Sequence, residues 1–328
     1  MKLGIVGNGK IVQQALKSLK DTDIKVEALW CRNEMKGKPL VLEYHIDSFY
    51  TDYDAFLKDE SFDTVYIGLI NSLHYGYMKK AILAHKNVIV EKPFTTNEFE
   101  AKELYDLARD YDCYIFEAIM SRYSLNYEEI RKNLEQIGDI KLIQCNFSQY
   151  SSRYDAYLKG EVLPAFDPKL SGGALYDINV YNIHFVEGLF GRPKKINYIA
   201  NIGFNGIDTS GIVTMKYDDY CATCTGAKDS SSKNYMMIQG TKGYIYVDSR
   251  PGLIKNVLLH LNDGTETMID VHQEDDPMKQ EFLRIQEVLD ASNKELMDTW
   301  LKDSVEVMDI LTKCRKDVGL IFQNDKKN

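Results

Sequence analysis

Apolar positions in the first third of the chain follow two different periods. Continuous apolar runs of strand length occupy Lys2–Val6, Lys25–Trp30 and Thr64–Ile70. After the first run, apolar residues recur three and four positions apart, the period of an amphipathic helix, at Ile11, Val12, Ala15, Leu16 and Leu19. Buried strands that alternate with helices are typical of β-α-β units, so this region predicts a doubly wound parallel sheet.

The same alternation continues to about residue 118. Further strands are predicted at Asn87–Val90 and Tyr114–Glu117. Thr95 and Glu98 have the spacing of a capping box and predict the start of the helix between these two strands. The parallel sheet is therefore expected to end near residue 120.

Beyond residue 121, strands follow one another with short turns. Five of them are predicted after a long strand at 140–150, at 196–204, 209–216, 220–226, 235–239 and 244–248. Turn sequences such as Asn205-Gly206 predict an antiparallel arrangement. Helices are expected at 126–136, 175–190, 278–292 and 303–317. We predict an α/β protein with a doubly wound domain at 1–120 and an α+β domain with an open, mostly antiparallel sheet at 121–328.

Composition and charge fit two globular domains and limit their partners. Of 328 residues, 44% are hydrophobic and 27% are charged, values near the average of folded proteins. With 40 Lys and Arg against 49 Asp and Glu, the net charge is −9, which argues against a nucleic-acid partner. No apolar run approaches the ~20 residues that span a bilayer. The first run stops at Gly7, too early for a signal peptide, so we expect a cytoplasmic protein without a membrane partner.

The six cysteines are too sparse for a disulfide framework, and we expect reduced thiols. Cys221 and Cys224 lie three apart on a predicted strand and therefore point to opposite faces. No second Cys or His pair lies nearby to complete a tetrahedral site, so no metal is predicted.

Gly7-Asn8-Gly9-Lys10-Ile11-Val12 follows the first strand and opens a helix. This is the context of a dinucleotide fingerprint, in which Gly7 permits the tight turn and Gly9 lets the backbone approach a pyrophosphate. Val12 stands at the third glycine position. The alternative is a generic strand-to-helix turn. We favour a Rossmann domain, because the pattern that follows is doubly wound.

In such a domain, the residues at the end of the second strand distinguish the ribose of NAD from the phosphorylated ribose of NADP. An acid there would bind the 2′-hydroxyl of NAD, whereas an arginine accommodates the 2′-phosphate of NADP. The sequence reads Trp30-Cys31-Arg32-Asn33, which favours NADP(H) through Arg32 with Asn33 as a polar helper. A solvated Arg32 without this role, and use of NAD(H), remain open.

Two further groups of residues carry candidate chemistry. Glu91-Lys92-Pro93 ends an apolar strand, where a lysine is costly to desolvate and proline restricts its backbone, so a functional Lys92 is favoured. A structural salt bridge is the alternative for Glu91. Asp177, Tyr181 and His184 recur at i, i+4 and i+7 after Gly172-Gly173, and this stripe can hold and move a proton. The alternative is that these three residues form a half-buried polar face of the helix with no role in proton transfer.

Several motifs occur together in an order that resembles the Gfo/Idh/MocA oxidoreductases, named for glucose-fructose oxidoreductase and inositol dehydrogenase. They are the Gly-x-Gly turn, Asn71-Ser72-Leu73-His74, Glu91-Lys92-Pro93, Glu117-Ala118-x-Met120-x-Arg122, Gly172-Gly173-Ala174-Leu175-x-Asp177-Ile178 and Gly240-Thr241-Lys242-Gly243. The resemblance covers nearly the whole chain. The pattern departs from the family at Ile70, Leu125 and Ser171.

The resemblance also implies roles for individual residues. Tyr181, where many members have histidine, is similar to the subgroup of glucose-fructose oxidoreductase and dimeric dihydrodiol dehydrogenase, which makes Tyr181 the general acid or base and Lys92 its electrostatic partner. The implied cofactor-binding set is Gly7, Asn8, Gly9, Lys10, Ile11, Arg32, Asn33, Asn71, His74, Glu91 and Lys92. The implied substrate contacts are Arg122, Asp177 and His184.

We therefore expect an NAD(P)-dependent oxidoreductase that transfers a hydride between nicotinamide and a carbinol or carbonyl carbon of a sugar, polyol, dihydrodiol or related small molecule. The open sheet of the second domain would expose apolar strand residues, so a homodimer or homotetramer is expected. Two alternatives remain: a non-catalytic nucleotide-binding sensor of the same fold, and an NAD-assisted glycoside hydrolase.

Overall fold

The computed structural model describes residues 1–327 and contains two compact units. Unit 1 comprises Met1–Ala118 and Met278–Val305, and unit 2 comprises Ile119–Pro277 and the chain from Glu306 onward. Residues 278–305, which the sequence-based division places in the second domain, thus pack with the first unit. The assignment of separate roles to domains 1–120 and 121–328 stays a prediction.

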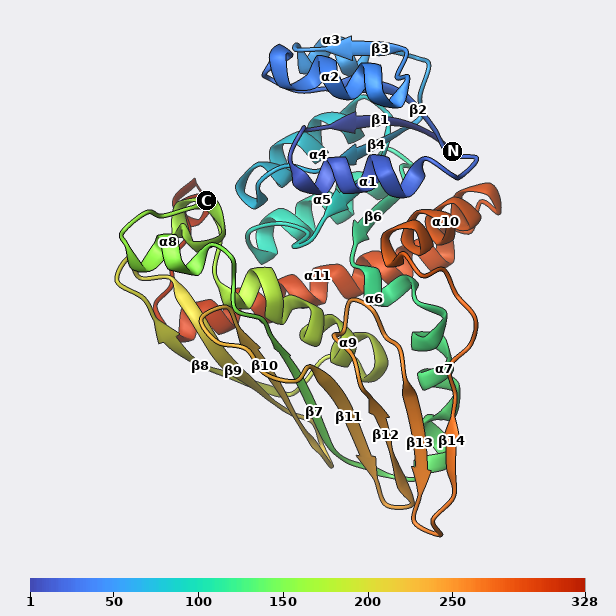
Figure 1. Ribbon diagram of the computed structural model, residues 1–328, viewed down its shortest axis with the longest axis vertical. Helices are drawn as coiled ribbons and strands as arrows, with labels where there is room; N and C mark the ends of the chain where they lie inside the picture. The colour runs from blue at the N-terminus through green and yellow to red at the C-terminus, as the bar shows by residue number, and fades with distance from the viewer. Residues whose placement is uncertain (328) are drawn as a thin grey trace. The chain divides into compact units, whose positions relative to one another are not determined.

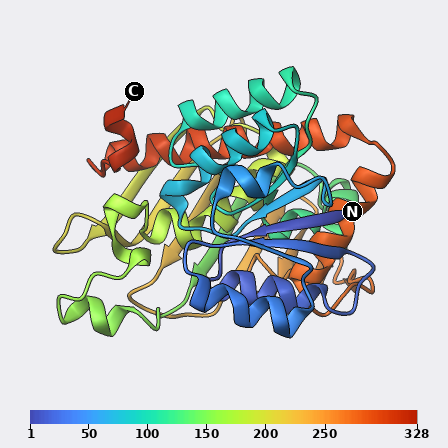
Figure 2. The ribbon, with the colours of Figure 1, turned by 90° about the horizontal axis from the view of Figure 1, so that it is seen from above.

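Unit 1 is built on a six-stranded parallel sheet (Figure 1). Its strands are β1 (Lys2–Val6), β2 (Lys25–Trp30), β3 (Ser48–Tyr50), β4 (Thr64–Ile67), β5 (Asn87–Glu91) and β6 (Ile115–Ala118). Its helices up to residue 118 are α1 (Lys10–Leu19), α2 (Glu34–Tyr44), α3 (Tyr53–Leu57), α4 (His74–Leu83) and α5 (Glu98–Asp110). Figure 2 shows α1 and α2 on one side of the blue strands and α5 on the other.

The strand order is β3-β2-β1-β4-β5-β6, and every neighbouring pair is parallel. The winding direction therefore changes between β1 and β4. In open α/β sheets, ligands bind outside the carboxyl ends of the strands at such a switch point. The predicted doubly wound fold is confirmed.

Local details of unit 1 differ from the prediction in two respects. Helix α5 begins at Glu98, and its N-cap is Asn97, whose side chain accepts from the Glu100 amide. The predicted capping box at Thr95 and Glu98 is thus wrong, because the residues that satisfy the first amides lie two positions later. Elements α2, β3 and α3 were not predicted, since α2 contains both a glycine and Pro39 and has little amphipathic character.

Unit 2 contains an eight-stranded sheet in the order β14-β13-β12-β11-β7-β10-β9-β8 (Figure 1). The strands are β7 (Ile140–Ser148), β8 (Lys195–Ile202), β9 (Asp208–Lys216), β10 (Cys221–Ala227), β11 (Tyr235–Gly240), β12 (Gly243–Val247), β13 (Val257–Leu261) and β14 (Glu266–Met268). All neighbouring pairs are antiparallel except β7 and β10, which run parallel. The open, mostly antiparallel sheet is confirmed, although β13 and β14 were not predicted.

Among the α-helices of unit 2 that precede β8, the last packs on the sheet. They are α6 (Met120–Tyr123), α7 (Leu125–Asn133), α8 (Tyr154–Leu158) and α9 (Val180–Phe190), which contacts β7 and β10. Two helices follow β14, α10 (Pro277–Asp290) and α11 (Lys294–Asp317), and α11 contributes its first half to unit 1 and its second half to unit 2. No helix among residues 1–327 is both long and apolar enough to cross a membrane.

Candidate functional site

The turn after β1 has the geometry that a nucleotide phosphate requires. Gly7 has φ +118°, and a Cβ at this position would lie 2.6 Å from the carbonyl oxygen of Gly68. Gly9 is the N-cap of α1, and a Cβ there would meet no atom within 4 Å. Gly7 is therefore required by the backbone of the turn, whereas Gly9 leaves open space in which a phosphate can approach the start of the helix.

Val12, at the third glycine position of the fingerprint, is accommodated by a second glycine elsewhere. Val12 is fully buried, and a Cβ on Gly68, which follows β4, would lie 2.5 Å from its Cγ2. The third glycine normally allows close packing of helix and strand. Here the glycine is Gly68, in the loop after the neighbouring strand. Helix α1 can therefore still pack close to the sheet although Val12 is larger than glycine.

The start of α1 is also electrostatically suited to an anion. Its first turn contains no acidic residue, and Lys10 in that turn is exposed. Unpaired amides and the helix dipole favour negative charge at a helix N-terminus. The Asn8 carbonyl accepts from the Gln13 side chain, which steadies the turn.

Arg32 and Asn33 follow β2 at the same edge of the sheet. Arg32 is exposed, and its charge lies close enough to Tyr77 to oppose the rise that burial causes in the pKa of that phenol. Asn33 is the N-cap of α2 and accepts from the Lys36 amide at 3.2 Å. Asn33, predicted as a polar helper in cofactor binding, thus also has a structural role, because its side-chain Oδ1 caps this helix.

Glu91 is the last residue of β5 and is buried. The Tyr66 hydroxyl donates to its Oε1 at 2.7 Å, and burial raises the pKa of Glu91 to about 7. The positive charge of Lys92 and the hydrogen bond from Tyr66 oppose this rise, but burial has the larger effect. The peptide bond between Lys92 and Pro93 is cis.

His74 and Glu117 fix the backbone that follows Lys92. The His74 ring lies between two carbonyl oxygens, with Nδ1 2.9 Å from that of Pro93 and Nε2 3.1 Å from that of Leu69. Glu117 accepts from the Phe94 amide at 2.8 Å. Burial lowers the pKa of His74. Because His74 and Glu117 are both buried, they can position Lys92 from inside the unit.

Unit 1 thus brings all the predicted cofactor residues to the carboxyl ends of four neighbouring strands. Residues 7–11 follow β1, Arg32 and Asn33 follow β2, and Asn71 and His74 follow β4. Glu91 ends β5 and Lys92 follows it. Within this set, His74 and Glu91 are buried, whereas Arg32 and Lys10 are exposed.

In unit 2, the glycine-rich turn and a buried aspartate fix the helix that carries Tyr181. Ser171 has φ 59° and Gly173 has φ +104°, and a Cβ on Gly173 would collide with Asp208. Asp208 accepts from the Leu175 amide at 2.6 Å and from the Tyr198 hydroxyl at 2.8 Å. Burial raises the pKa of Asp208. Asp208 therefore anchors the first turn of this helix to the start of β9.

The helix begins with a π-helical turn, Leu175–Asn179, and continues as α9. Asn179 donates to the Cys224 carbonyl at 2.9 Å and Asn182 to the Thr225 carbonyl at 2.8 Å, which ties the helix to β10. The Tyr181 ring packs edge-on against Phe147, with centroids 5.9 Å apart. π-Helical turns occur frequently at functional sites.

The predicted stripe of three residues is not uniformly accessible. Asp177 and Tyr181 are half-buried, but His184 is buried. Arg122 is buried as well, with its guanidinium over the Tyr127 ring at 5.6 Å and against Gly188 of α9. Direct substrate contacts of His184 and Arg122 therefore stay predictions, and their surroundings here are those of packed residues.

Sequence reasoning missed the residue that pairs with Asp177. Lys228 follows β10, and its Nζ lies 2.7 Å from Asp177 Oδ2. Fifty residues separate the two along the chain, so no local pattern links them. A buried lysine at the end of a strand was the available signal, as it was for Lys92.

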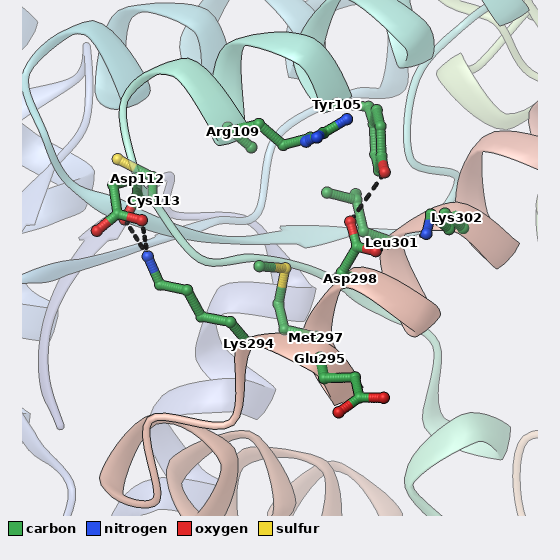
Figure 3. Close-up of a pocket in the computed structure, with 11 residues that line it drawn as sticks. Tyr105, Arg109, Asp112, Cys113, Lys294, Glu295, Met297, Asp298, Leu301 and Lys302 are labelled. Carbon is green, nitrogen blue, oxygen red and sulfur yellow. Dashed lines mark hydrogen bonds and ion pairs between the residues drawn. The ribbon is translucent and has the colours of Figure 1, made fainter.

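A cavity of about 430 Å³ lies elsewhere in unit 1, between α5 and the first half of α11 (Figure 3). Among its charged lining residues, Lys294 pairs with Asp112 and Lys302 with Asp298, and the Tyr105 hydroxyl donates to Asp298. None of the predicted site residues lines this cavity. Among residues 1–327, no cluster of three His, Cys, Asp or Glu side chains is arranged to hold a metal, and the six cysteines are not bonded to one another.

Two family models match the chain, and together they cover most of its length. Residues 1–118 match the model described as "Oxidoreductase family, NAD-binding Rossmann fold", and residues 127–246 match the Gfo/Idh/MocA C-terminal domain. The chain belongs to the Gfo/Idh/MocA family. The predicted NAD(P)-dependent oxidoreductase is therefore confirmed at the level of the family.

Relatives with named activities align over almost the whole Gfo/Idh/MocA chain. The scyllo-inositol 2-dehydrogenase (NADP(+)) IolU of Bacillus subtilis is 29% identical, with 99% of each chain covered. Trans-1,2-dihydrobenzene-1,2-diol dehydrogenase of Xenopus tropicalis is 28% identical, with 98% of this chain and 99% of the relative covered. The similarity to the dihydrodiol dehydrogenase subgroup is thus confirmed.

The fold also matches that of solved structures. A 3-ketoreductase from Actinomadura kijaniata, in complex with NADP and TDP-benzene, superposes with a TM-score of 0.84 at 19% identity, with 97% of each chain covered. This likeness supports the family architecture of both units.

Proposed function

We propose that this protein is an NADP(H)-preferring dehydrogenase that acts on a cyclic vicinal diol or polyol. The observation that carries the proposal is that a chain of this family retains Lys92 at a fixed strand end and Tyr181 on a helix anchored to β10. The substrates named for the two aligned dehydrogenases, scyllo-inositol and a dihydrobenzenediol, are both six-membered carbocycles with adjacent hydroxyls. A sugar or another polyol belongs to the same chemical class.

The residues at the switch point fit a dinucleotide. Gly7 and Gly9 would admit the pyrophosphate to the start of α1, and Arg32 would bind a 2′-phosphate. Preference for NADP(H) is supported by the NADP(+) in the name of the IolU relative and by the exposed arginine after β2. The bound nicotinamide supplies hydride transfer at C4.

We assign proton transfer to Tyr181. In oxidation, its Oη takes the proton of the substrate hydroxyl as a hydride leaves the carbinol carbon, and in reduction it returns the proton. Lys92, as an ammonium, would lower the free energy of the phenolate. Asn71 and Asp177 would orient the substrate. His74 and Glu117 are buried and would position Lys92 through their hydrogen bonds to the backbone of Pro93 and Phe94.

Steady-state kinetics with scyllo-inositol and NADP test this assignment. We expect Tyr181→Phe and Lys92→Met each to lower kcat by ~10²–10⁴-fold while leaving the Kd of NADPH near its wild-type value. The double variant should be little worse than either single variant, because the two groups act on one proton. Tyr244→Phe, on the sheet, is the matched control and should change neither quantity. Full turnover by Tyr181→Phe would show that another group transfers the proton.

We further propose that the open face of the unit 2 sheet is covered by a second copy of the chain. Ile199 on β8 lies opposite Ile212 on β9, and they are 66% and 44% exposed. Met268 on β14, at the other edge, is 57% exposed. Exposed apolar patches of this kind mark interaction surfaces. A homodimer or homotetramer in the cytoplasm stays our expectation.

A further inference from the structure

Lys228 is a buried lysine that the proposed mechanism does not use. It follows β10 and is 1% exposed. Its Nζ donates to the Ala165 carbonyl oxygen at 2.7 Å, lies 2.7 Å from Asp177 Oδ2, and stands 4.4 Å from the centre of the Phe166 ring. A long charged side chain normally reaches toward water, and burying its ammonium is costly unless the charge is compensated.

The ion pair between Lys228 and Asp177 is asymmetric. The Lys228 side chain is 2% exposed, whereas that of Asp177 is 33% exposed. The ammonium therefore approaches the carboxylate from the interior of unit 2, and the carboxylate keeps access to solvent. A carboxylate that keeps access to solvent beside a buried ammonium can still receive a ligand.

A second carboxylate lies near the same lysine. Asp208, which is fully buried, is near enough that the Lys228 charge opposes the burial-induced rise in its pKa. Asp208 anchors the Leu175 amide at the start of the helix that carries Asp177. Lys228 thus joins three parts of the site: the helix start, Asp177, and the loop at Ala165.

We propose that Lys228 is a positioning residue that holds the Asp177 carboxylate in place, so that this carboxylate accepts a hydrogen bond from the substrate hydroxyl beside the reacting carbinol. The inference rests on the proposed function, because it assigns the substrate to the carboxylate of Asp177. The ammonium is not needed for the backbone ladder. The Lys228 amide donates to Thr209 and its carbonyl accepts from Ser151, and both bonds are independent of the side chain.

A kinetic double-mutant cycle of the full-length protein tests this role. We expect Lys228→Met to lower kcat/KM for scyllo-inositol by roughly 10–100-fold, mainly through KM, with the Kd of NADPH unchanged. In an Asp177→Asn background, the same substitution should change kcat/KM by less than about threefold, because its target no longer carries a charge. An equal loss in both backgrounds would overturn the proposal. Lys228→Arg, which keeps the charge, should recover part of the lost kcat/KM.

The matched control is Lys255→Met. Lys255 also pairs with an aspartate of unit 2, at 2.9 Å from Asp275 Oδ1, but that aspartate is fully exposed. We expect no change in KM or kcat. A rise in KM equal to that of Lys228→Met would show that loss of any lysine in this unit has the same effect.

Thermal unfolding separates this inference from the proposed function, since it needs no substrate. Lys228→Met removes the buried ammonium that pairs with the half-buried Asp177 carboxylate, so we expect a lower Tm, and adding Asp177→Asn should restore part of the loss. Restoration in a protein that oxidises no diol would support the pair while refuting the dehydrogenase assignment. If Asp177→Asn restores nothing, Lys228 serves the fold without acting through Asp177, and the positioning role is wrong.

Discussion

Gly68→Ala should destabilise unit 1 and weaken cofactor binding, because it removes the space that Val12 occupies. The new methyl would lie 2.5 Å from Val12 Cγ2 and 3.3 Å from Ile11 Cγ2, whereas carbon atoms pack best at about 3.5–4.0 Å. Val12 is buried in α1, where a β-branched side chain has one strongly preferred rotamer, so it cannot turn aside. Overpacking of this kind costs about 1–3 kcal/mol. If α1 shifts instead, Gly9 moves with it, and we expect the Kd of NADPH to rise.

The compensating change is Val12→Ala. Alone, it removes two buried methyl groups and should cost about 2 kcal/mol. Combined with Gly68→Ala, the new methyl fills the vacated space, so the double variant should be more stable than the sum of the single effects by at least about 1 kcal/mol. Urea unfolding followed by tryptophan fluorescence measures this, because both tryptophans, Trp30 and Trp300, lie in unit 1.

Gly76→Ala is the control for the backbone effect of replacing glycine. Gly76 lies in α4, and a Cβ there would meet no atom within 4 Å. Alanine is the better helix former, so this variant should be up to about 1 kcal/mol more stable than the parent. A Gly68→Ala variant as stable as the parent, or additive effects in the double variant, would refute the packing argument.

Three further predictions concern charge and assembly. Arg32→Ser should raise the Kd of NADPH at least about tenfold and that of NADH much less, and equal losses by fluorescence titration would remove Arg32 from 2′-phosphate recognition. Because the pKa of Glu91 is raised to about 7 in the fold, its ionisation should cost stability as pH rises from about 4.5 to 7, by up to about 3 kcal/mol. Glu91→Gln should therefore flatten the pH dependence of urea stability in this range, and an unchanged profile would place the titrating group elsewhere. Ile199→Asp with Ile212→Asp should reduce the mass measured by light scattering to that of the monomer, and an unaltered oligomer would exclude this face.

Much of the fold could be predicted from hydrophobic period alone. The parallel strands of unit 1 are short, apolar and separated by amphipathic helices, so their positions follow from the local sequence. Helix α2 and the strands β13 and β14 escaped prediction, because their residues are only partly buried and their stability depends on the elements beside them.

The candidate site shows the same division. The positions of Gly7, Gly9 and Lys92 follow from motifs that join a strand to what comes after it. The burial of His184 could not be predicted from a motif. Asp177, Tyr181 and His184 share one helical spacing, and only the packing around α9 shows that His184 is buried whereas the other two are half-buried.

The sequence by itself determined most of the strands and helices, the fingerprint turn and the residue types available for proton transfer, because each depends on neighbours along the chain. Only the tertiary structure decided which distant residues meet. The loop after β4 supplies the glycine that makes room for Val12, and Lys228 reaches Asp177 from the end of another strand. Such contacts depend on how distant elements pack against one another, and the amino-acid sequence does not state the distances between them.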